Sequence, residues 1–409
     1  MANDQIFVGL EIGTTKICVI VAEGRSDGTI SILGVGETPS RGVRKGEIVD
    51  LATVSECVRE ALLDAEDKTN VEIGNVWVAI TGSHLRGFNN RGIFILPEER
   101  DVIIEEDLQT VEVNAKEVSL PSANTFLHTI IQSYHVDGNE NVLSPIDMVG
   151  SRLEADFHIV HGVKNRIQNT LRCLESLKLG IEDVVLSSLA SALVVLTQQQ
   201  KDLGALVVDM GGGTTDYLVY LDGAVRHSGV LAVGGDHITS DISIGLRLPI
   251  ARAELLKIQE GSAIDPVDSR GGGITLKNDP GFLGCEIDRR SLDTIIHLRI
   301  REIFELIRLD IESTGKGVLG MMGAGVMITG GCARLRDIAT VAEDVFELPV
   351  QLTRAKDVGG ATQTFENPQF STAIGLAKYA MAVSANIPEE SLLQKMAHGL
   401  GGLFRRSSR

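Results

Sequence analysis

The fold of this chain is decided by the stretch Leu206-Val-Val-Asp209-Met-Gly211-Gly212-Gly213-Thr214-Thr215-Asp216-Tyr-Leu-Val. A shorter copy of the pattern lies near the N-terminus and reads Val8-Gly-Leu-Glu11-Ile-Gly13-Thr14-Thr15-Lys16-Ile-Cys-Val-Ile. In each copy a β-branched strand leads into a carboxylate, glycine and a Thr-Thr pair, and a second strand follows. Glycine lets the backbone adopt positive φ and approach a ligand closely, and successive N–H groups in such a turn form a nest for an anion. Two copies predict a clamp that holds a polyphosphate between two similarly built halves.

Length and composition restrict the class of protein. The 409 residues are enough for two or more domains, and 43% hydrophobic beside 23% charged residues is ordinary for a soluble globular protein. The net charge of -17 argues against nucleic acid as the main partner, because phosphate binding needs a basic face. The five cysteines show no metal-ligand spacing, and we find no signal peptide or spanning apolar segment. We therefore expect a reduced, cytosolic protein.

Apolar periodicity and the positions of glycine predict alternating strands and helices. Strands are expected at residues 17–22, 29–36, 76–81, 129–134, 153–161 and 326–329, and as a pair turning at Asn89-Asn90. Helices are expected at residues 51–68, 105–116, 164–179, 183–199, 288–314 and 370–383, and from residue 335 onward. The glycine-rich stretch 261–285 is expected to be a mobile surface loop. Residues from about 83 to 163 differ in texture from their surroundings and are expected to form a small inserted domain.

The order of these pieces resembles the actin-like ATPases, a superfamily that includes actin, heat-shock chaperone ATPases and sugar kinases. Residues 11–16 and 209–216 are similar to its two phosphate loops, and residues 328–335 to its adenosine loop. Residues 187–196 and 372–379 resemble the two crossing helices at the hinge. The resemblance implies an α/β, ribonuclease-H-like duplicated fold, with two halves around a nucleotide cleft.

Within that superfamily the chain is most similar to the bacterial cell-division FtsA family. The stretch Ser40–Leu51, a small domain inserted in the first half, and the C-terminal tail carry this resemblance. It implies the following domains: 1–83 plus 164–197, with the return of 361–383, as the first core half; 84–163 as an inserted, SHS2-like domain; 198–227 plus 308–360 as the second core half; 228–307 as its small subdomain; 384–390 as a linker; and 391–409 as a membrane-targeting tail.

The resemblance implies that ATP and magnesium are the cofactors. Phosphate contacts are expected from backbone amides and hydroxyls of the two loops, at Gly13, Thr14, Thr15, Gly211, Gly212, Gly213, Thr214 and Thr215. Lys16 is placed to meet the phosphate charge, with an outward-facing strand lysine as the alternative. Asp209 matches the catalytic acid that orients the magnesium hydration shell, and Glu11 stands where many relatives have aspartate. Adenosine contacts are expected at Gly234, Gly235, Gly330 and Gly331.

The hydrolysis rate is expected to be low. Chaperone-type relatives place a glutamate at the start of the first hinge helix, where it helps to position the attacking water. Here residues 185–190 read Val-Leu-Ser-Ser-Leu-Ala, and serine is a poor base. The sequence therefore predicts tight MgATP binding with at most slow ATPase activity, so that ATP acts mainly as a ligand for assembly.

The last nineteen or so residues have the pattern of an interfacial helix. Its apolar positions recur at helical spacing and basic residues lie beside them: Leu393, Met396, Leu400, Leu403, Phe404, Arg405 and Arg406. Each basic residue near an anionic lipid surface contributes about 1 kcal/mol. Glycines in the tail weaken the helix in water, so it is expected to order on the surface of the membrane.

The helix at 288–314 is the expected partner site, because in FtsA the corresponding surface receives the C-terminal tail of FtsZ. Arg299, Arg301 and Glu302 are its candidate contacts, since arginine can bind carboxylates in a bidentate manner. A solvated charged face is the alternative. By the same resemblance the inserted domain serves filament contacts and later divisome proteins.

The predicted function is a cell division protein that polymerises on the cytoplasmic face of the inner membrane at the septum. There it would anchor the FtsZ ring and recruit later divisome proteins. Two alternatives remain open from the residues alone. One is a small-molecule kinase of the same superfamily, and the other is an actin-like scaffold of a pilus or secretion machine.

Overall fold

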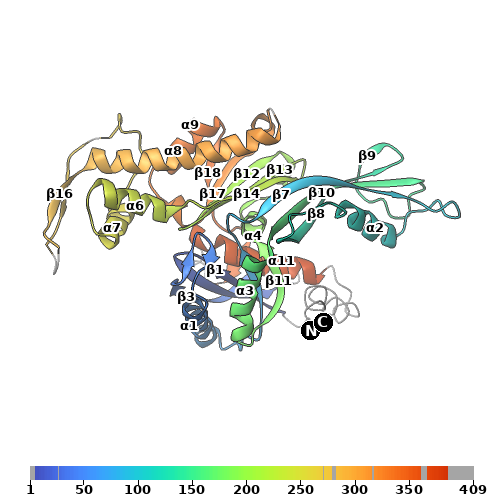
Figure 1. Cartoon of the computed structure of the whole chain (residues 1–409), viewed down its shortest axis with the longest axis horizontal. Helices are drawn as coiled ribbons and strands as arrows, with labels where there is room; N and C mark the ends of the chain where they lie inside the picture. The colour runs from blue at the N-terminus through green and yellow to red at the C-terminus, as the bar shows by residue number, and fades with distance from the viewer. Residues whose placement is uncertain are drawn as a thin grey trace.

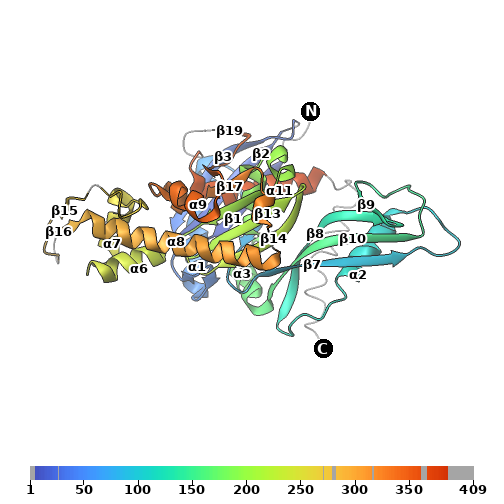
Figure 2. The same cartoon turned by 90° about the horizontal axis from the view of Figure 1, so that it is seen from above.

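The computed structural model describes residues 5–25, 27–269, 271–278, 282–315, 317–360 and 366–385. The molecule is elongated, with a pair of sheets at its centre (Figure 1). A domain of strands β7 to β10 extends from one end, and helices α6 and α7 with a small hairpin extend from the other (Figure 2).

The first half is built on a sheet with the strand order β11-β6-β1-β2-β3-β19. Its strands are β1 (Ile6–Ile12), β2 (Lys16–Gly24), β3 (Ile30–Pro39), β6 (Asn75–Ile80), β11 (Gly180–Leu186) and β19 (Val358–Gly360). Strands β1, β2 and β3 run antiparallel in sequence order, and β1 pairs in parallel with β6.

The second half repeats this arrangement in a sheet with the order β14-β13-β12-β17-β18. Its strands are β12 (Ala205–Met210), β13 (Thr215–Leu221), β14 (Ala224–Leu231), β17 (Gly325–Thr329) and β18 (Val350–Leu352). Strand β12 is antiparallel to β13 and parallel to β17, as β1 is to β2 and β6. Each glycine loop therefore joins the first two strands of its sheet. The duplicated actin-like fold predicted from the sequence is confirmed.

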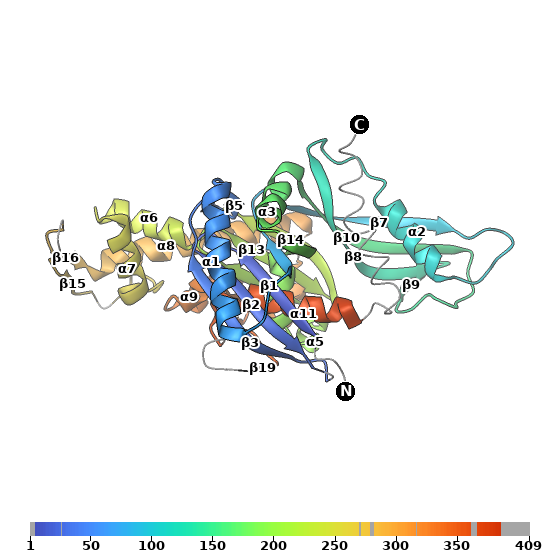
Figure 3. The same cartoon turned by 90° about the horizontal axis from the view of Figure 1, so that it is seen from below.

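Helices of the first half lie on its sheet and against the second half. They are α1 (Leu51–Thr69), α3 (Lys164–Ser176), α4 (Ser187–Val195) and α11 (Ser371–Ala385), with a short 3-10 turn η3 (Pro368–Phe370). The short helix α5 (Gln198–Asp202) follows α4 and contacts β13 of the second sheet. Helices α4 and α11 pack at very close range, because a Cβ on Gly375 would lie 2.0 Å from Ala190 O. Helix α11 contacts β1 and β2 of the first sheet, and α4 contacts β12 and β13 of the second, so the two helices lie between the two halves (Figure 1 and, seen from below, Figure 3).

The inserted domain is a sheet of order β7-β10-β8-β9 with one helix packed on it. Its elements are β7 (Arg86–Ile95), α2 (Glu105–Ala115), β8 (Asn124–Val136), β9 (Asn139–Val142) and β10 (Arg152–Val163). The strand pair expected around Asn89-Asn90 is wrong, because β7 runs straight through both residues. The Asn90 side chain donates to Ala115 O at 2.8 Å and Asn89 donates to Arg226 O at 3.0 Å. Partners outside the strand thus satisfy amides that would otherwise favour a turn.

The helix expected at 183–199 is confirmed only from Ser187 to Val195, and its predicted start is wrong. Residues 180–186 form β11, which pairs in parallel with β6, and the helix begins only at Ser187. A short apolar run suits a buried strand as well as a helix, so periodicity alone does not separate them. The glycine-rich stretch 261–285 contains part of a hairpin, β15 (Gly273–Leu276) with β16 (Cys285–Asp288).

The remaining helices cover the second half and form its outer end. They are α6 (Gly235–Gly245), α7 (Ile250–Glu260), α8 (Arg289–Thr314) and α9 (Ile338–Phe346), with 3-10 turns η1 (Leu319–Met321) and η2 (Gly331–Arg334). The domain boundaries drawn at 227/228 and 307/308 fall inside β14 and α8, which run through them without a break. Residues 386–409, with most of the linker and the whole tail, lie outside the described residues. In the described part of the chain, no helix combines the length and apolar character needed to cross a membrane.

Candidate functional site

The two glycine loops close in the same way and touch each other. Gly13 N–H donates to Lys16 O at 2.9 Å, and Gly211 N–H donates to Thr214 O at 2.9 Å. A Cβ on Gly213 would lie 2.2 Å from Thr14 Oγ1, so only glycine permits the loops to approach this closely. The two halves of the chain therefore meet at the loops that the sequence singled out.

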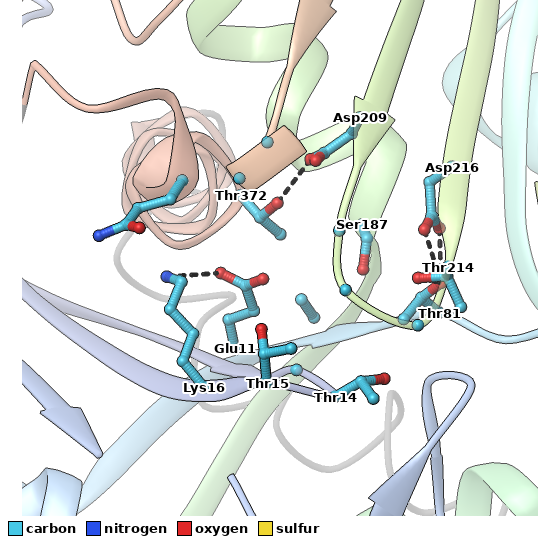
Figure 4. Close-up of a pocket in the computed structure, with 18 of the residues that line it drawn as sticks. Glu11, Thr14, Thr15, Lys16, Thr81, Ser187, Asp209, Thr214, Asp216 and Thr372 are labelled. Carbon is cyan, nitrogen blue, oxygen red and sulfur yellow. Dashed lines mark hydrogen bonds and ion pairs between the residues drawn. The ribbon is translucent and has the colours of Figure 1, made fainter. Parts of the chain in front are cut away.

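A pocket opens between the loops (Figure 4). Residues of the hinge helices α4 and α11, and the two glycines that follow β17, complete its wall. The lining residues are Glu11, Ile12, Gly13, Thr14, Thr15, Lys16, Ala79, Thr81, Ser187, Asp209, Gly211, Gly212, Gly213, Thr214, Asp216, Gly330, Gly331, Gln369 and Thr372.

On the first-loop side of this pocket lie two charged groups that lack hydrogen bonds. Lys16 Nζ is 3.8 Å from Glu11 Oε2 and 4.5 Å from the centre of the Phe370 ring. Both Lys16 Nζ and Glu11 Oε2 are buried, and neither has a hydrogen-bond partner among the described residues. Burial raises the pKa of Glu11. Burial alone would lower the pKa of Lys16, but the neighbouring Cys18 and acidic groups together raise it. A buried amino group that lacks a hydrogen-bond partner in the described part of the chain favours a ligand that supplies one.

Asp209, on the second-loop side, is held by both hinge helices. Its Oδ2 accepts hydrogen bonds from Thr372 Oγ1 at 2.8 Å and from Ser191 Oγ. A Cβ on Gly330 would lie 2.4 Å from the other carboxyl oxygen, Oδ1, and Gly330 has φ of 86°. Both the close approach and the positive φ therefore require glycine at this position. Burial raises the pKa of Asp209 and the two hydroxyl groups oppose that rise. The acid is therefore oriented in advance, with Oδ1 free of these two bonds.

A second buried acid lies beside it. Thr81 Oγ1 is 2.7 and 2.8 Å from the two carboxyl oxygens of Asp216 and bonds to both. Burial is the main cause that raises the pKa of Asp216 to about 8. Both residues were missed as site residues by the sequence analysis. Asp216 closes the quoted glycine stretch and could have been chosen, whereas Thr81 carries no signal in the sequence.

Most of the predicted cofactor residues line the pocket, but three do not. Thr215 lies in β13, and its hydroxyl donates to Val233 O at 2.8 Å, away from the pocket. Gly234 is the N-cap of α6 and Gly235 is its first residue, and Gly235 N–H donates to Gly211 O at 3.0 Å. Residues of the site that the sequence analysis did not select are Thr81, Ser187, Ser191, Asp216, Gln369 and Thr372.

The candidate partner residues on α8 already have partners within this chain. Arg299 bonds to Asp241 at 2.6 and 3.0 Å and also to Glu302. Arg301 bonds to Glu305 at 2.9 Å. An acidic peptide would have to compete with these carboxylates, since the charged face is internally paired.

The duplicated sheets, the opposed glycine loops and the crossing helices define an actin-like protein. Comparison with protein families agrees in detail. The model for "Cell division protein FtsA" matches residues 206–375, and the model for the "SHS2 domain inserted in FTSA" matches residues 82–161. The cell division protein FtsA of Neisseria meningitidis serogroup B is 35% identical over 100% of this chain and 99% of its own length. The chain belongs to the FtsA family of cell division proteins.

Solved structures support the fold. A PilM-PilN type IV pilus biogenesis complex matches with a TM-score of 0.65 at 14% identity, covering 92% of this chain and 98% of that one. MreB5 of Spiroplasma citri, bound to ADP, matches with a TM-score of 0.56 at 15% identity, covering 94% and 99%. At these identities the likeness extends to the actin-like fold alone.

Proposed function

We propose that the pocket between the two glycine loops binds MgATP. The observation that carries this proposal is that Lys16 Nζ and Glu11 Oε2 are buried, without a hydrogen-bond partner among the described residues, beside two loops of glycine amides. Phosphate oxygens would supply the missing acceptors for Lys16, and the loop amides would bind the remaining charge. The actin-like neighbour MreB5 is itself bound to ADP, which supports a nucleotide as the ligand.

The residues of the pocket fit a magnesium nucleotide. The hydroxyl and amide groups around Gly13–Thr15 and Gly211–Thr214 would hold the phosphates. Asp209 would orient water bound to the metal, and the ion itself would neutralise charge on the phosphates. Gly330 and Gly331 would form the wall on the adenosine side, where a Cβ on Gly331 would meet no other atom within 4 Å.

Hydrolysis is proposed to be slow. The Ser187 hydroxyl at the start of α4 already donates to Ile80 O at 3.0 Å, so it can only accept from a water. The α4 residue that lines the pocket is therefore a weak group for positioning a nucleophile, a role that matters greatly in phosphoryl transfer. ATP would then act chiefly by stabilising one arrangement of the two halves.

At the level of the cell, we propose a peripheral protein on the cytoplasmic face of the inner membrane at the division septum. Family membership supports self-assembly in actin-like filaments, anchorage of the FtsZ ring through the α8 surface, and recruitment of later divisome proteins through the inserted domain. Leu298 on α8 is 60% exposed and could add an apolar contact for the FtsZ tail. The basic, apolar tail would provide the membrane contact. Family membership favours this function over the small-molecule kinase and the pilus scaffold.

Sedimentation with anionic liposomes tests the proposal. The full chain and a chain ended at Ser384 are compared, each with MgATP and with MgADP. We expect only the full chain to pellet, and more of it with MgATP. If both chains stay in the supernatant with either nucleotide, the proposed membrane anchor is wrong.

A further inference from the structure

A small hairpin touches both glycine loops at one end of the pocket. It consists of β4 (Val43–Arg44) and β5 (Glu47–Ile48), joined by a turn in which Lys45 and Gly46 have φ of 52° and 75°. Gly46 N–H donates to Thr14 Oγ1 at 3.0 Å. A Cβ on Gly46 would lie 2.9 Å from Thr81 Cγ2 and 3.0 Å from Thr214 Cγ2. The turn is thus in contact with the first half and the second half at once.

The strand after that turn is tied to the base of the inserted domain. Glu47 forms an ion pair with Arg166, which lies in the first turn of α3, directly after β10. Strand β5 packs beside α3, as the view from below shows (Figure 3). A Cβ on Gly82 would lie 3.3 Å from Glu47 Cγ, so Glu47 also touches the segment through which the chain enters the inserted domain.

The two chain crossings between the first half and the inserted domain meet at one histidine. Val163 N–H, on the returning crossing, donates to His84 Nδ1 on the outgoing crossing at 3.3 Å. A Cβ on Gly162 would lie 2.9 Å from the same nitrogen. Burial, together with Arg166 and Arg86, lowers the pKa of His84 to about 4, so at neutral pH its ring nitrogen can accept this bond. The crossings therefore form one packed unit beside Glu47.

We propose that the β4–β5 hairpin couples the nucleotide in the pocket to the inserted domain, with the Glu47–Arg166 pair as the link. The inference rests on the proposed binding of nucleotide between the loops. A terminal phosphate that changes how Thr14 and Thr214 approach each other must displace Gly46, because the turn is in van der Waals contact with both sides. A hairpin this short moves as a unit, so Glu47 carries the displacement to Arg166 and to the crossings.

Hydrogen–deuterium exchange on the full chain tests this coupling. Amide exchange at residues 82–85 and 162–166 is compared with magnesium and either a non-hydrolysable ATP analogue or ADP. We expect the wild type to show different protection of these crossings in the two states. The Glu47→Gln variant should lose that difference, while its affinity for ADP changes by less than about twofold because Glu47 does not line the pocket.

A control substitution at a neighbouring ion pair and an exchange of the two charges at Glu47 and Arg166 test the link further. Glu60 on α1 forms an ion pair with Arg41 at 4.0 Å. This pair connects the segment just before the hairpin to α1 and not to the crossings. Glu60→Gln should keep the difference in exchange. Glu47→Arg combined with Arg166→Glu should restore it, although each change alone abolishes it.

The outcomes are distinguishable. Failure of the wild type to bind either nucleotide would refute the proposed function and this inference with it. Nucleotide binding with no difference at the crossings, or a difference that survives in Glu47→Gln, would overturn the inference and leave the proposed function standing. Equal loss in Glu60→Gln would also overturn it.

Discussion

The two glycine loops close with the same backbone hydrogen bond but differ in how their polar side chains are hydrogen-bonded. Each closes with the same hydrogen bond from its first glycine to a carbonyl three residues on. In the first loop, Lys16 Nζ and Glu11 Oε2 are buried and have no hydrogen bond to any residue that the structure describes. In the second loop, Asp209 and Asp216 bond to hydroxyl groups that distant segments of the chain supply.

This difference assigns separate roles to two similar loops. Buried polar groups are nearly always hydrogen-bonded in folded proteins, and exceptions call for a functional reason. On the proposed function, the groups of the first loop would be satisfied by the ligand, while the acids of the second loop are already held by hydroxyl groups of the chain. A repeat in the sequence thus becomes a functional asymmetry in the fold.

The largest effect is expected from removing the cation of the first loop. Lys16→Met should weaken MgATP binding by about 10- to 150-fold, because a hydrogen bond to a charged group is worth about 1.5–3 kcal/mol. Isothermal titration calorimetry measures the change. Lys68→Met is the matched control, since Lys68 forms an exposed pair with Asp64 at 2.7 Å outside the pocket. Equal affinities for the two variants would contradict the role given to Lys16.

The pH dependence of stability should distinguish the acids. The folded-state pKa of Asp216 is raised to about 8, so the folded protein holds a proton that the unfolded chain has released. Its stabilising contribution is complete below about pH 4 and is lost as the pH rises through about 8. Urea unfolding should therefore show the wild type losing stability relative to Asp216→Asn over that range, with a slope of up to about 1.4 kcal/mol per pH unit, which corresponds to one proton per molecule.

Asp107, in the inserted domain, is the control of opposite sign. Arg100 bonds to its carboxyl group and lowers its pKa. The stability that it contributes is present above the ordinary aspartate pKa and is lost as the pH falls. The wild type should therefore lose stability relative to Asp107→Asn as the pH is lowered, which is the reverse of the trend expected for Asp216. A difference between wild type and Asp216→Asn that does not change with pH would refute the assignment of a neutral Asp216.

Substitution of two serines on α4 tests how much the hydrogen bond to Asp209 contributes to the free energy of unfolding. Ser191→Ala removes one of the hydroxyl donors to Asp209 and should lower the free energy of unfolding by about 1–3 kcal/mol. Ser188→Ala removes a buried hydroxyl that lacks a hydrogen-bond partner among the described residues, and it should be neutral or stabilising. Urea titration of both variants at one pH gives the comparison. Similar losses for both would mean that packing on α4, rather than the bond to Asp209, sets the cost.

The smallest effect separates the second threonines of the two Thr-Thr pairs, Thr15 and Thr215. Thr215→Val removes the hydroxyl that donates to Val233 O and should cost about 0.5–1.5 kcal/mol of stability. Thr15 is exposed, so Thr15→Val should change the stability by less than about 0.5 kcal/mol. Thermal or urea unfolding of the pair decides the point. If Thr15→Val costs as much stability as Thr215→Val, the Thr15 side chain makes stabilising contacts that its exposed position does not indicate.

Much of the site could be read from the sequence because its framework is local. The glycines, the Thr-Thr pairs and the carboxylates of both loops stand at fixed offsets from their strands, and the structure brings all of them except Thr215 to one pocket. Thr81 could not be found in this way, since nothing in its neighbourhood marks it. The bidentate contact between Arg299 and Asp241 was equally hidden, because the two residues lie on different helices.

The sequence by itself determined the duplicated strand-loop-strand units, the inserted domain and the positions where glycine is needed. These follow from side-chain periodicity and turn chemistry, which are properties of neighbouring residues. Only the tertiary structure decided which buried groups have partners. Asp209 and Thr372 are 163 positions apart, and the hydrogen bond between them exists only because the two hinge helices cross beside β12. The same holds for the hairpin that meets both loops, because contacts between distant segments are set by packing and leave no local pattern.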